Sequence, residues 1–377
     1  MSHRPLRVAH VVATTGRSGV ESHLTALLPG FDRGDIESLL FVPAPGPLVD
    51  ALAARGYTTE IGAPVRKLAW ADAHALAARL RGKFDVLHAH GPRAAFWAAH
   101  IARWSRIPCF VCTVHELRWL SLPPGPQRAL WVAFESWALS RANRLIVLSR
   151  DSESRVRERY PHWASRLTRI PGSTPLLHDA DRLPRAHPGR SDGPLRVITI
   201  GRFQWVKRHD RLIEAVAIAR RRGVEIELHI AGDGELGDAL RERASALGVA
   251  ACIHWPGASF DVAGLLASGQ VFASASHTET FGIAALEAMA VGLPVVTCDN
   301  GGVSELVEDG VCGTVVHDRT DPGAANGLAE AFVALAADPT RRAAWGEAAA
   351  RRARERFAPA VMARATAALY REAGVTP

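Results

Sequence analysis

The feature that most constrains the fold is a regular alternation of short apolar runs with longer helical patterns along most of the chain. Apolar runs such as RVAHVVAT (7–14), FDVLHAH (84–90) and RLIVLS (144–149) are each followed by about ten or more residues with helical spacing. Strands that alternate with helices of that length form βαβ units and therefore a parallel sheet. The sequence predicts an α/β fold.

The alternation stops once, at residues 171–194, where Pro, Gly, Arg, His and Asp dominate and little periodicity is visible. It starts again with LRVITIGRF (195–203). Because 377 residues are many for one hydrophobic core, the break indicates two doubly wound domains with a ligand site in the cleft between them. The predicted ranges are 1–172 for the first domain, 173–193 for the linker, 194–358 for the second domain and 359–377 for a final helix.

Cysteine, charge and hydropathy patterns exclude several classes of protein. The five cysteines are scattered, and Cys109 and Cys112 stand three apart in a predicted strand, where their side chains cannot share a metal or a disulfide. Reduced thiols fit a cytoplasmic protein. No apolar run reaches 18 residues, and the N-terminus lacks the apolar segment of a signal peptide. The net charge of +7 suits a solvated surface or contact with an anionic membrane, and we expect no nucleic-acid partner.

Two glutamates stand out in the apolar stretch HTETFGIAALEAMAVGLPVV (277–296). We expect a helix over 281–291, so that Glu279 precedes its start and Glu287 lies about two turns inside. Buried carboxylates need hydrogen-bond donors, and the hydroxyls of a sugar and a ribose can supply them. Alternatively, Glu279 is solvated, and Glu287 caps a neighbouring element or pairs with an arginine.

The start of this helix also suits a phosphate. Its first N–H groups have no partner within the helix, and Gly282 lets a ligand approach the backbone closely. We expect Thr278 or Thr280 to cap the start, and Gly292 with Pro294 to end the helix.

Three further motifs follow predicted strands. In GRFQWVKRHDRLIEAV (201–216), Arg202, Lys207 and the next helix start can hold a diphosphate, although a basic surface patch explains them equally well. The turn in TTGRSGVESH (14–23) can cradle a phosphate or be an ordinary strand-to-helix turn. His115 follows a strand, where a lone histidine has either a functional or a structural role.

Together these motifs resemble glycosyltransferase family 4, whose retaining enzymes have the GT-B fold. The resemblance covers nearly the whole chain, and its most specific part is ETFGIAALEAMAVGLPVVTCDNGGVSELVEDGVCGTVV (279–316). It implies two facing Rossmann-like domains with a cleft between them, the first binding the acceptor and the second the nucleotide-sugar donor. It also implies that the final helix, from Pro359, crosses back to the first domain.

The resemblance implies a role for each motif residue of the second domain's helix. Glu287 would accept the ribose hydroxyls of the nucleotide. Glu279, with the backbone of Phe281, Gly282 and Ile283, would face the transferring sugar and its phosphates.

It likewise implies roles for the remaining motifs. Arg202 and Lys207 would bind the diphosphate and stabilise its charge as it leaves. Gly19 would approach the phosphates from the first domain, and His115 would lie near the donor sugar and the acceptor.

The sequence departs from the family pattern at three places. Ser18-Gly19 stands where the family has two glycines, Arg208 stands where a glycine often follows the motif lysine, and PGS (171–173) stands where an Asn-Gly turn is expected. None of these changes removes a charged residue that the chemistry needs.

We expect transfer without a metal or other cofactor, so that EDTA should leave turnover intact, because cations and a helix start stabilise the leaving diphosphate. His88 and His90 could bind a metal, but no third ligand is evident. The DAD sequence at 179–181 resembles a metal motif of another glycosyltransferase fold, but no strand precedes it. The anomeric configuration would be retained, with the leaving phosphate assisting the acceptor hydroxyl, and a UDP-sugar is expected ahead of a GDP-sugar.

Two other functions fit the architecture: a sugar-nucleotide epimerase that needs no acceptor, and a non-catalytic protein that binds nucleotide sugars. The joint presence of the motif residues argues against the second. The acceptor would bind variable loops of the first domain, of which RWLSLPPGPQRALW (118–131) is the candidate. Its Trp, Leu and Pro content, with the positive charge, predicts a saccharide or lipid-linked acceptor reached by a protein at the inner face of the cell membrane.

Overall fold

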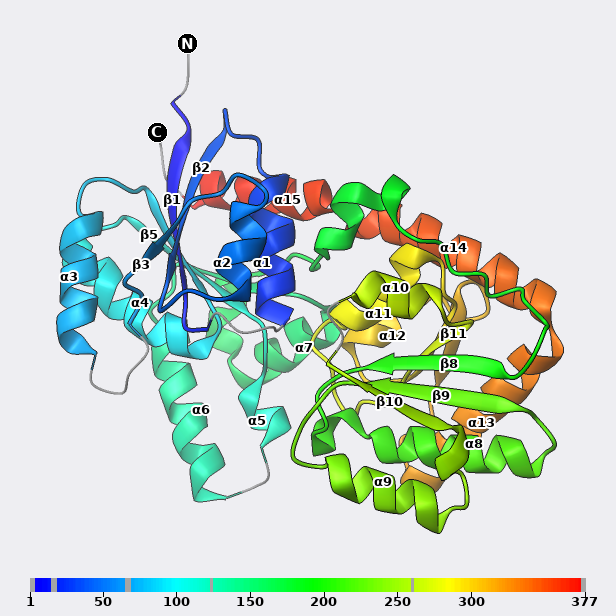
Figure 1. Ribbon diagram of the computed structural model, residues 1–377. Coiled ribbons are helices and arrows are strands. Elements are labelled where there is room, and N and C mark those ends of the chain that lie inside the picture. The colour runs from blue at the N-terminus through cyan, green and yellow to red at the C-terminus, as the bar shows by residue number, and fades with distance from the viewer. Residues whose placement is uncertain (1–3, 15–18, 65–68, 123–124, 259–260, 374–377) are drawn as a thin grey trace. The chain divides into compact units, whose positions relative to one another are not determined.

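The computed structural model describes residues 4–14, 19–64, 69–122, 125–258 and 261–373 of the chain. It divides into two compact units, and the division falls between His178 and Asp179. Unit 1 comprises Met1–His178 together with Ala358–Pro377, and unit 2 comprises Asp179–Phe357. Each unit has a parallel sheet with helices (Figure 1), so the predicted α/β class with two Rossmann-like units is confirmed.

Within the described residues, the sheet of unit 1 has seven parallel strands in the order β3-β2-β1-β4-β5-β6-β7. The strand order reverses between β1 and β4, and ligands of such sheets bind at the carboxyl ends beside that reversal. The strands are β1 (Leu6–Val12), β2 (Ile36–Val42), β3 (Thr59–Ile61), β4 (Val86–His90), β5 (Cys109–Val114), β6 (Arg144–Val147) and β7 (Leu167–Arg169).

Helices cover this sheet, and the last helix of the chain is one of them. Gly30, at the end of α1, lies so close to the start of α15 that an added Cβ would be 2.9 Å from the Pro359 carbonyl oxygen. Tyr370 of α15 is fully buried, and Arg371 forms an ion pair with Asp35 at 2.9 Å. The helices are α1 (Gly19–Gly30), α2 (Pro47–Ala53), α3 (Trp70–Leu80), α4 (Pro92–Ser105), α5 (Arg118–Ser121), α6 (Pro126–Leu139), α7 (Arg150–Arg159) and α15 (Pro359–Glu372), with 3₁₀ turns at Pro161–Arg166 and Pro175–Arg182.

The segment expected to be an acceptor loop is partly helical. Between α5 and the start of α6 at Pro126, residues 123–124 lie outside the described part of the chain. The helix α6 therefore begins inside the segment 118–131 that was expected to be a loop. Pro126 in the first turn explains this start, because its fixed φ suits a helix and its missing N–H needs no partner there.

Within the described residues, the sheet of unit 2 has six parallel strands in the order β10-β9-β8-β11-β12-β13, which reverses between β8 and β11. Its strands are β8 (Leu195–Ile200), β9 (Ile226–Ala231), β10 (Ile253–Gly257), β11 (Val271–Ser274), β12 (Val295–Cys298) and β13 (Gly313–Val316). Its helices are α8 (His209–Arg221), α9 (Gly237–Ala246), α10 (Val262–Ala267), α11 (Ile283–Val291), α12 (Gly302–Leu306), α13 (Asp321–Ala337) and α14 (Pro339–Phe357), with 3₁₀ turns at Trp205–Lys207 and Ala250–Cys252.

The five cysteines are free and buried, as expected for reduced thiols. Among the described residues, no helix is both long and apolar enough to cross a membrane.

The segment predicted as a linker is fixed to unit 2 by a buried arginine. Arg342 of α14 is 2% exposed, and its guanidinium donates hydrogen bonds to the carbonyl oxygens of Pro188, Arg190, Leu335 and Ala336. Because a guanidinium offers five donors in a planar fork, one side chain satisfies carbonyls from two separate segments. The segment is therefore held by its backbone, although its sequence shows little periodicity.

Arg342→Met should lower the free energy of unfolding of unit 2 by at least about 2 kcal/mol, because four carbonyl groups each lose a hydrogen bond from the buried guanidinium. Urea unfolding of the full chain, followed by circular dichroism, measures this. Arg341→Met is the matched control: the Arg341 side chain is 47% exposed, pairs with Asp338 at 3.2 Å and lies 5.9 Å from the Trp345 ring centroid, so its loss should cost about 0.5 kcal/mol or less. Equal losses from the two variants would contradict the role given to Arg342.

Candidate functional site

The basic residues of unit 2 lie where its strand order reverses. Arg202 is the second residue after the end of β8, and its side chain is exposed. Within the described part of the chain, it takes part in no ion pair. Lys207 ends the 3₁₀ turn before α8. Both residues therefore stand at the carboxyl end of a central strand, where a ligand of this type of sheet is expected.

Lys207 and Glu279, which are distant in the sequence, form an ion pair. Lys207 Nζ lies 2.5 Å from Glu279 Oε2, and both side chains are partly shielded from solvent, with exposures of 28% and 19%. The loops that carry them are joined by a hydrogen bond from the His277 N–H to the Val206 carbonyl (2.8 Å). The sequence analysis selected both residues but did not predict that they pair.

A third loop, after β12, holds the backbone of Glu279. The Glu279 N–H donates to the Asn300 carbonyl (3.0 Å), and the Gly302 N–H donates to the Glu279 carbonyl (2.8 Å). Glycine is required at 302, because an added Cβ would lie 2.4 Å from the Phe281 nitrogen. The carboxylate is thus positioned by loops that follow β8, β11 and β12.

The helix after Glu279 begins later than predicted. α11 starts at Ile283 with Gly282 as its N-cap at a φ of 97°, and no side chain caps it. The expected cap by Thr278 or Thr280 is therefore wrong. Gly282 has a second constraint, since an added Cβ would lie 2.3 Å from Val303 Cγ2. The predicted end is confirmed: Gly292 is the C-cap at a φ of 94°.

Glu287 lies on the half-buried face of α11. Ile283, Ala284 and Glu287 are the partly exposed residues of this helix, and the other six are buried. Positions three and four apart share one face of a helix, so Glu287 lies on the same face as the helix start. Phe281, just before the helix, is 4% exposed. That Glu287 contacts a ribose stays a prediction.

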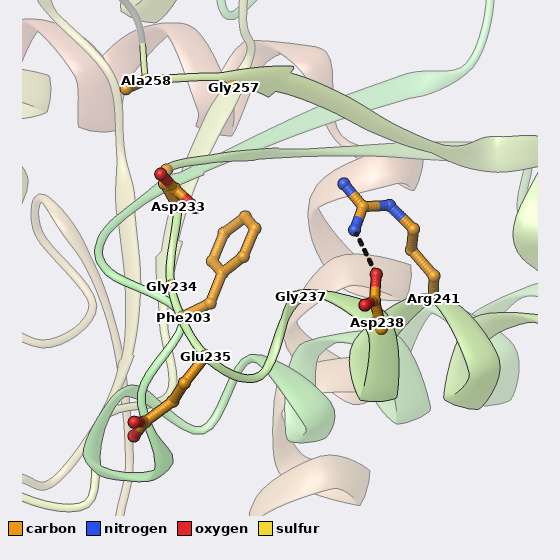
Figure 2. A pocket seen from close by; sticks show the side chains of 10 residues that line it. Phe203, Asp233, Gly234, Glu235, Gly237, Asp238, Arg241, Gly257 and Ala258 are labelled. Atoms are coloured by element: carbon orange, nitrogen blue, oxygen red, sulfur yellow. Dashed lines mark hydrogen bonds and ion pairs between the residues drawn. The ribbon is translucent and has the colours of Figure 1, made fainter.

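A cavity of about 350 Å³, which the sequence analysis missed, lies at the carboxyl ends of β8, β9 and β10. Figure 2 shows Phe203, Asp233 and Arg241 around it, with Arg241 in an ion pair with Asp238 at 3.3 Å. Its loops pass so closely that an added Cβ at Gly234 would lie 2.7 Å from the Phe203 carbonyl oxygen. The glycines in AGDGE, directly after a strand, were the available signal.

Arg208 explains one departure from the family pattern. It has left-handed backbone, with a φ of 48°, which glycine adopts without cost and other residues rarely adopt. Its guanidinium forms ion pairs with Asp210 and Asp321, both at 2.7 Å, and buried Arg211 also pairs with Asp321. These arginines hold the pKa of Asp321 well below its usual value. The ion pairs join the starts of α8 and α13 and offset the backbone cost of an arginine.

In unit 1, His115 belongs to a cluster of five histidines beside the reversal between β1 and β4. His115 directly follows β5, as predicted, and the other members come from β1, α1 and β4. The rings lie close together: the centroids of His88 and His90 are 4.2 Å apart, and those of His23 and His115 are 4.7 Å apart. The cluster, called here the histidine cluster, consists of His10, His23, His88, His90 and His115.

Hydrogen bonds connect His115 to the interior of the sheet. Ser38 Oγ lies 3.4 Å from His10 Nε2, His10 Nδ1 lies 3.1 Å from His90 Nε2, and His90 Nδ1 lies 3.4 Å from His115 Nε2. A neutral imidazole donates from one nitrogen and accepts at the other, so the N–H groups along this chain must point in one direction. The tautomer of His115 is therefore coupled to that of His10.

The remaining members differ in their hydrogen bonding. His88 is bonded at both ring nitrogens, to the Tyr370 hydroxyl (2.6 Å) and to Thr113 Oγ1 (2.8 Å). His23 is buried, and neither of its ring nitrogens has a hydrogen-bond partner among the described residues. Its nitrogens are therefore available to a ligand or to water beside His115.

Two sets of three histidines have ring nitrogens within 4.8 Å of one another: His10 with His88 and His90, and His23 with His90 and His115. The sequence analysis found no third ligand for His88 and His90, and the structure supplies His10. His88 is already hydrogen-bonded at both nitrogens, and His10 and His90 are bonded to each other, so a metal would have to displace these bonds. The hydrogen bonds favour neutral, metal-free histidines in the first of these two sets.

Gly19, expected to contact phosphates, is the exposed first residue of α1. The rest of that turn, residues 15–18 with Ser18, lies outside the described residues.

Comparison with known proteins shows the family of this chain. The model of Glycosyltransferase Family 4 matches residues 17–174, and that of group 1 glycosyl transferases matches residues 182–352. A glycogen synthase of Mycobacterium tuberculosis (strain CDC 1551 / Oshkosh) is 30% identical over 294 residues, which cover 76% of this chain and 68% of that protein. This chain belongs to glycosyltransferase family 4.

Other relatives agree with this assignment. The alpha-D-kanosaminyltransferase of Streptomyces kanamyceticus is 28% identical, over 79% of this chain and 80% of its own length. Among solved structures, Anabaena Alr3699/HepE in complex with UDP and glucose matches with a TM-score of 0.81 at 20% identity, covering 97% of this chain and all of that chain. WaaG, a glycosyltransferase of lipopolysaccharide biosynthesis, matches with a TM-score of 0.71 at 19% identity, covering 96% and 99%. The last two likenesses show a shared fold.

As a member of family 4, this chain is a glycosyltransferase that uses a nucleotide-sugar donor. The epimerase and non-catalytic alternatives are not favoured. One family model lies within unit 1 and the other within unit 2. Every member of the histidine cluster except His10 falls in the first matched region, and the Lys207–Glu279 pair falls in the second.

The histidine cluster should make the glycosyltransferase unstable in mild acid. Burial, followed by repulsion from His23, lowers the pKa of His10 to about 3, and burial lowers the pKa of His23 to about 4. The pKa values of His88, His90 and His115 also lie well below the usual value, mainly because of burial. Below about pH 6.5 the unfolded chain binds protons that the folded chain does not, so stability falls as the pH falls.

Each histidine that stays neutral should remove up to about 1.4 kcal/mol of unfolding free energy per pH unit below about pH 6.5. Urea unfolding of the wild type at several pH values between 7 and 5 measures the slope. His23→Leu should flatten it by one such contribution, and the exposed His187→Leu serves as control for losing a histidine. A wild-type stability that is constant over this pH range would contradict the burial of neutral histidines.

Proposed function

We propose that this glycosyltransferase transfers a hexose, with retention, from a UDP-sugar to a hydroxyl of a saccharide or lipid-linked acceptor in the synthesis of a cell-surface polysaccharide or glycolipid. The observation that carries the donor part is the Lys207–Glu279 ion pair, held by three loops at the strand reversal of unit 2. UDP is named first because Anabaena Alr3699/HepE, which shares the fold, was solved with UDP and with UDP-glucose.

The donor's diphosphate would bind Arg202, Lys207 and the start of α11. In the absence of a donor, Glu279 neutralises Lys207. An incoming diphosphate would attract Lys207 through charge-assisted hydrogen bonds and release the Glu279 carboxylate, which then accepts hydroxyls of the sugar. Gly282 at the N-cap leaves no side chain between the phosphates and the first N–H groups of α11. Glu287 would accept the ribose hydroxyls.

The transfer breaks the bond between the sugar's anomeric carbon and the phosphate oxygen, and the bonding electrons leave with the diphosphate. Arg202 and Lys207 would stabilise that negative charge. The two cationic side chains would thus do what a metal ion does in other enzymes. The acceptor hydroxyl attacks the same face of the sugar, forms the new glycosidic bond, and gives its proton to the leaving phosphate oxygen. His115, kept neutral by burial, would hydrogen-bond the donor sugar or the acceptor and orient it for attack.

The acceptor side would lie in unit 1, whose candidate surface surrounds the start of α6. Leu130 is 72% exposed there, and the Arg93 guanidinium lies 6.0 Å from the Trp131 ring centroid. An exposed leucine among arginines suits the interface of an anionic membrane, in which a lipid-linked acceptor would be embedded.

Glu287→Gln should abolish the thermal stabilisation that one nucleotide family gives to the wild type. We expect UDP and UDP-sugars to stabilise the wild type more than GDP or ADP compounds, by about 2.7 kcal/mol at 100 times the dissociation constant. The exposed Glu330→Gln, on α13 of the same unit, is the matched control and should respond as the wild type does. Stabilisation of the wild type and Glu287→Gln by the same amount would overturn the role of Glu287, and no response from any nucleotide would overturn the donor site.

Leu130→Ser should weaken binding to phosphatidylglycerol vesicles at low salt, because it removes apolar area from the proposed membrane contact. Co-sedimentation of the purified protein with these vesicles measures the bound fraction. Ile61→Ser removes an apolar side chain that is 57% exposed elsewhere in unit 1 and should leave binding unchanged. If the wild type stays unbound at low salt, the peripheral membrane contact is wrong.

A further inference from the structure

Three side chains with metal-ligating atoms meet on one face of the unit 2 sheet, at its edge. Glu227 and His229 stand two apart on β9, so both point to the same face. His254, on the edge strand β10, is the direct register partner of His229. Ile226 and Leu228 point to the opposite face and are fully buried in the core. The three side chains are called here the edge triad.

The spacing of the edge triad is that of a metal site rather than of hydrogen bonds. Glu227 Oε2 lies 3.6 Å from His229 Nε2, and Glu227 Oε1 lies 3.9 Å from His254 Nε2. One ligand atom from each residue fits within 4.8 Å of the other two. Two ligands on a tetrahedral zinc ion at about 2.0–2.1 Å lie roughly 3.4 Å apart. To hold one ion, the side chains would move inward and the two stacked rings would turn toward each other.

Both Nε2 atoms of the edge triad are shielded from solvent, and neither has a hydrogen-bond partner among the described residues. The two rings stack, with centroids 4.5 Å apart and an interplanar angle of 28°, so their Nε2 atoms lie on the same side of the stack, next to Glu227. Buried polar atoms without partners cost free energy, and a metal ion would satisfy both lone pairs at once.

One cationic side chain already lies beside the carboxylate of the edge triad. Arg196 on β8 is the neighbouring cation, with its Nε 3.4 Å from Glu227 Oε2. Its side chain is 42% exposed and can turn toward solvent when a divalent ion takes its place at the carboxylate.

We propose that the edge triad binds one divalent first-row transition-metal ion, such as Zn²⁺, through Glu227, His229 and His254. A fourth coordination position would be open to water. Two imidazoles and one carboxylate are a ligand set that such ions accept. The ligands lie within the strands, whereas the residues of the transferase site follow the carboxyl ends of strands. The ion would therefore stabilise the edge of the sheet and take no part in sugar transfer.

The experiment counts zinc ions bound to the full chain. The purified protein is dialysed against micromolar Zn²⁺, and bound metal is measured by mass spectrometry for the wild type, His254→Gln and Glu227→Gln. Each variant should hold one equivalent less than the wild type. The exposed His187→Gln, also in unit 2, is the matched control and should bind as the wild type does. The wild type and the three variants all retain the histidine cluster. The difference in bound zinc between the wild type and a triad variant therefore reports on the edge triad alone.

The same proteins titrated with Co²⁺ give a second measurement. The wild type should show the visible absorption of four-coordinate cobalt, and the two triad variants should lack that component. Equal zinc counts and equal cobalt spectra for the wild type and both triad variants would overturn the proposal. Circular dichroism confirms that each variant is folded, and the result does not depend on whether the donor site is assigned correctly.

Discussion

The ion pair between Lys207 and Glu279 is the contact on which the donor side of the candidate site depends. Its two members come from loops after β8 and β11, the neighbouring strands between which the strand order of unit 2 reverses. At such a reversal the chain leaves adjacent strands toward opposite faces of the sheet, and the loops separate. The pair bridges that separation, and the loop after β12 fixes Glu279 through its backbone. Glycine at 282 and 302 lets these loops approach within backbone contact.

Unit 1 uses the corresponding reversal differently. Between β1 and β4 it places a histidine cluster, four of whose five members are buried, instead of a partly shielded pair of charges. Burying so many polar rings is costly unless they are hydrogen-bonded, and all but His23 are bonded to one another or to their neighbours. One of those partners, Tyr370, belongs to the last helix, so closing the fold with α15 also completes the hydrogen bonds beneath His115.

The sequence predicted the strands inside the two sheets and missed three strands at sheet edges. Three strands were missed: β3, β7 and β13, which have three or four residues each and lie at sheet edges. They are too short to show a period, and they form because a neighbouring strand offers free backbone groups. The helix around Glu287 was predicted with the correct end, since Gly292 and Pro294 are local signals. Its start was wrong, because Gly282 caps it through contacts with a distant residue, Val303.

The sequence by itself determined the α/β class, the loss of periodicity over residues 171–194 and the identity of the charged residues, because period, glycine position and side-chain chemistry are local properties. Only the tertiary structure decided which residues meet. Separate segments of the chain come together in three places. Lys207 pairs with Glu279, and Glu227 lies beside His254. His10 and His23 lie in one cluster with His115. Such meetings follow from strand order and register, which are set by the packing of the whole sheet and leave no signal in any single segment.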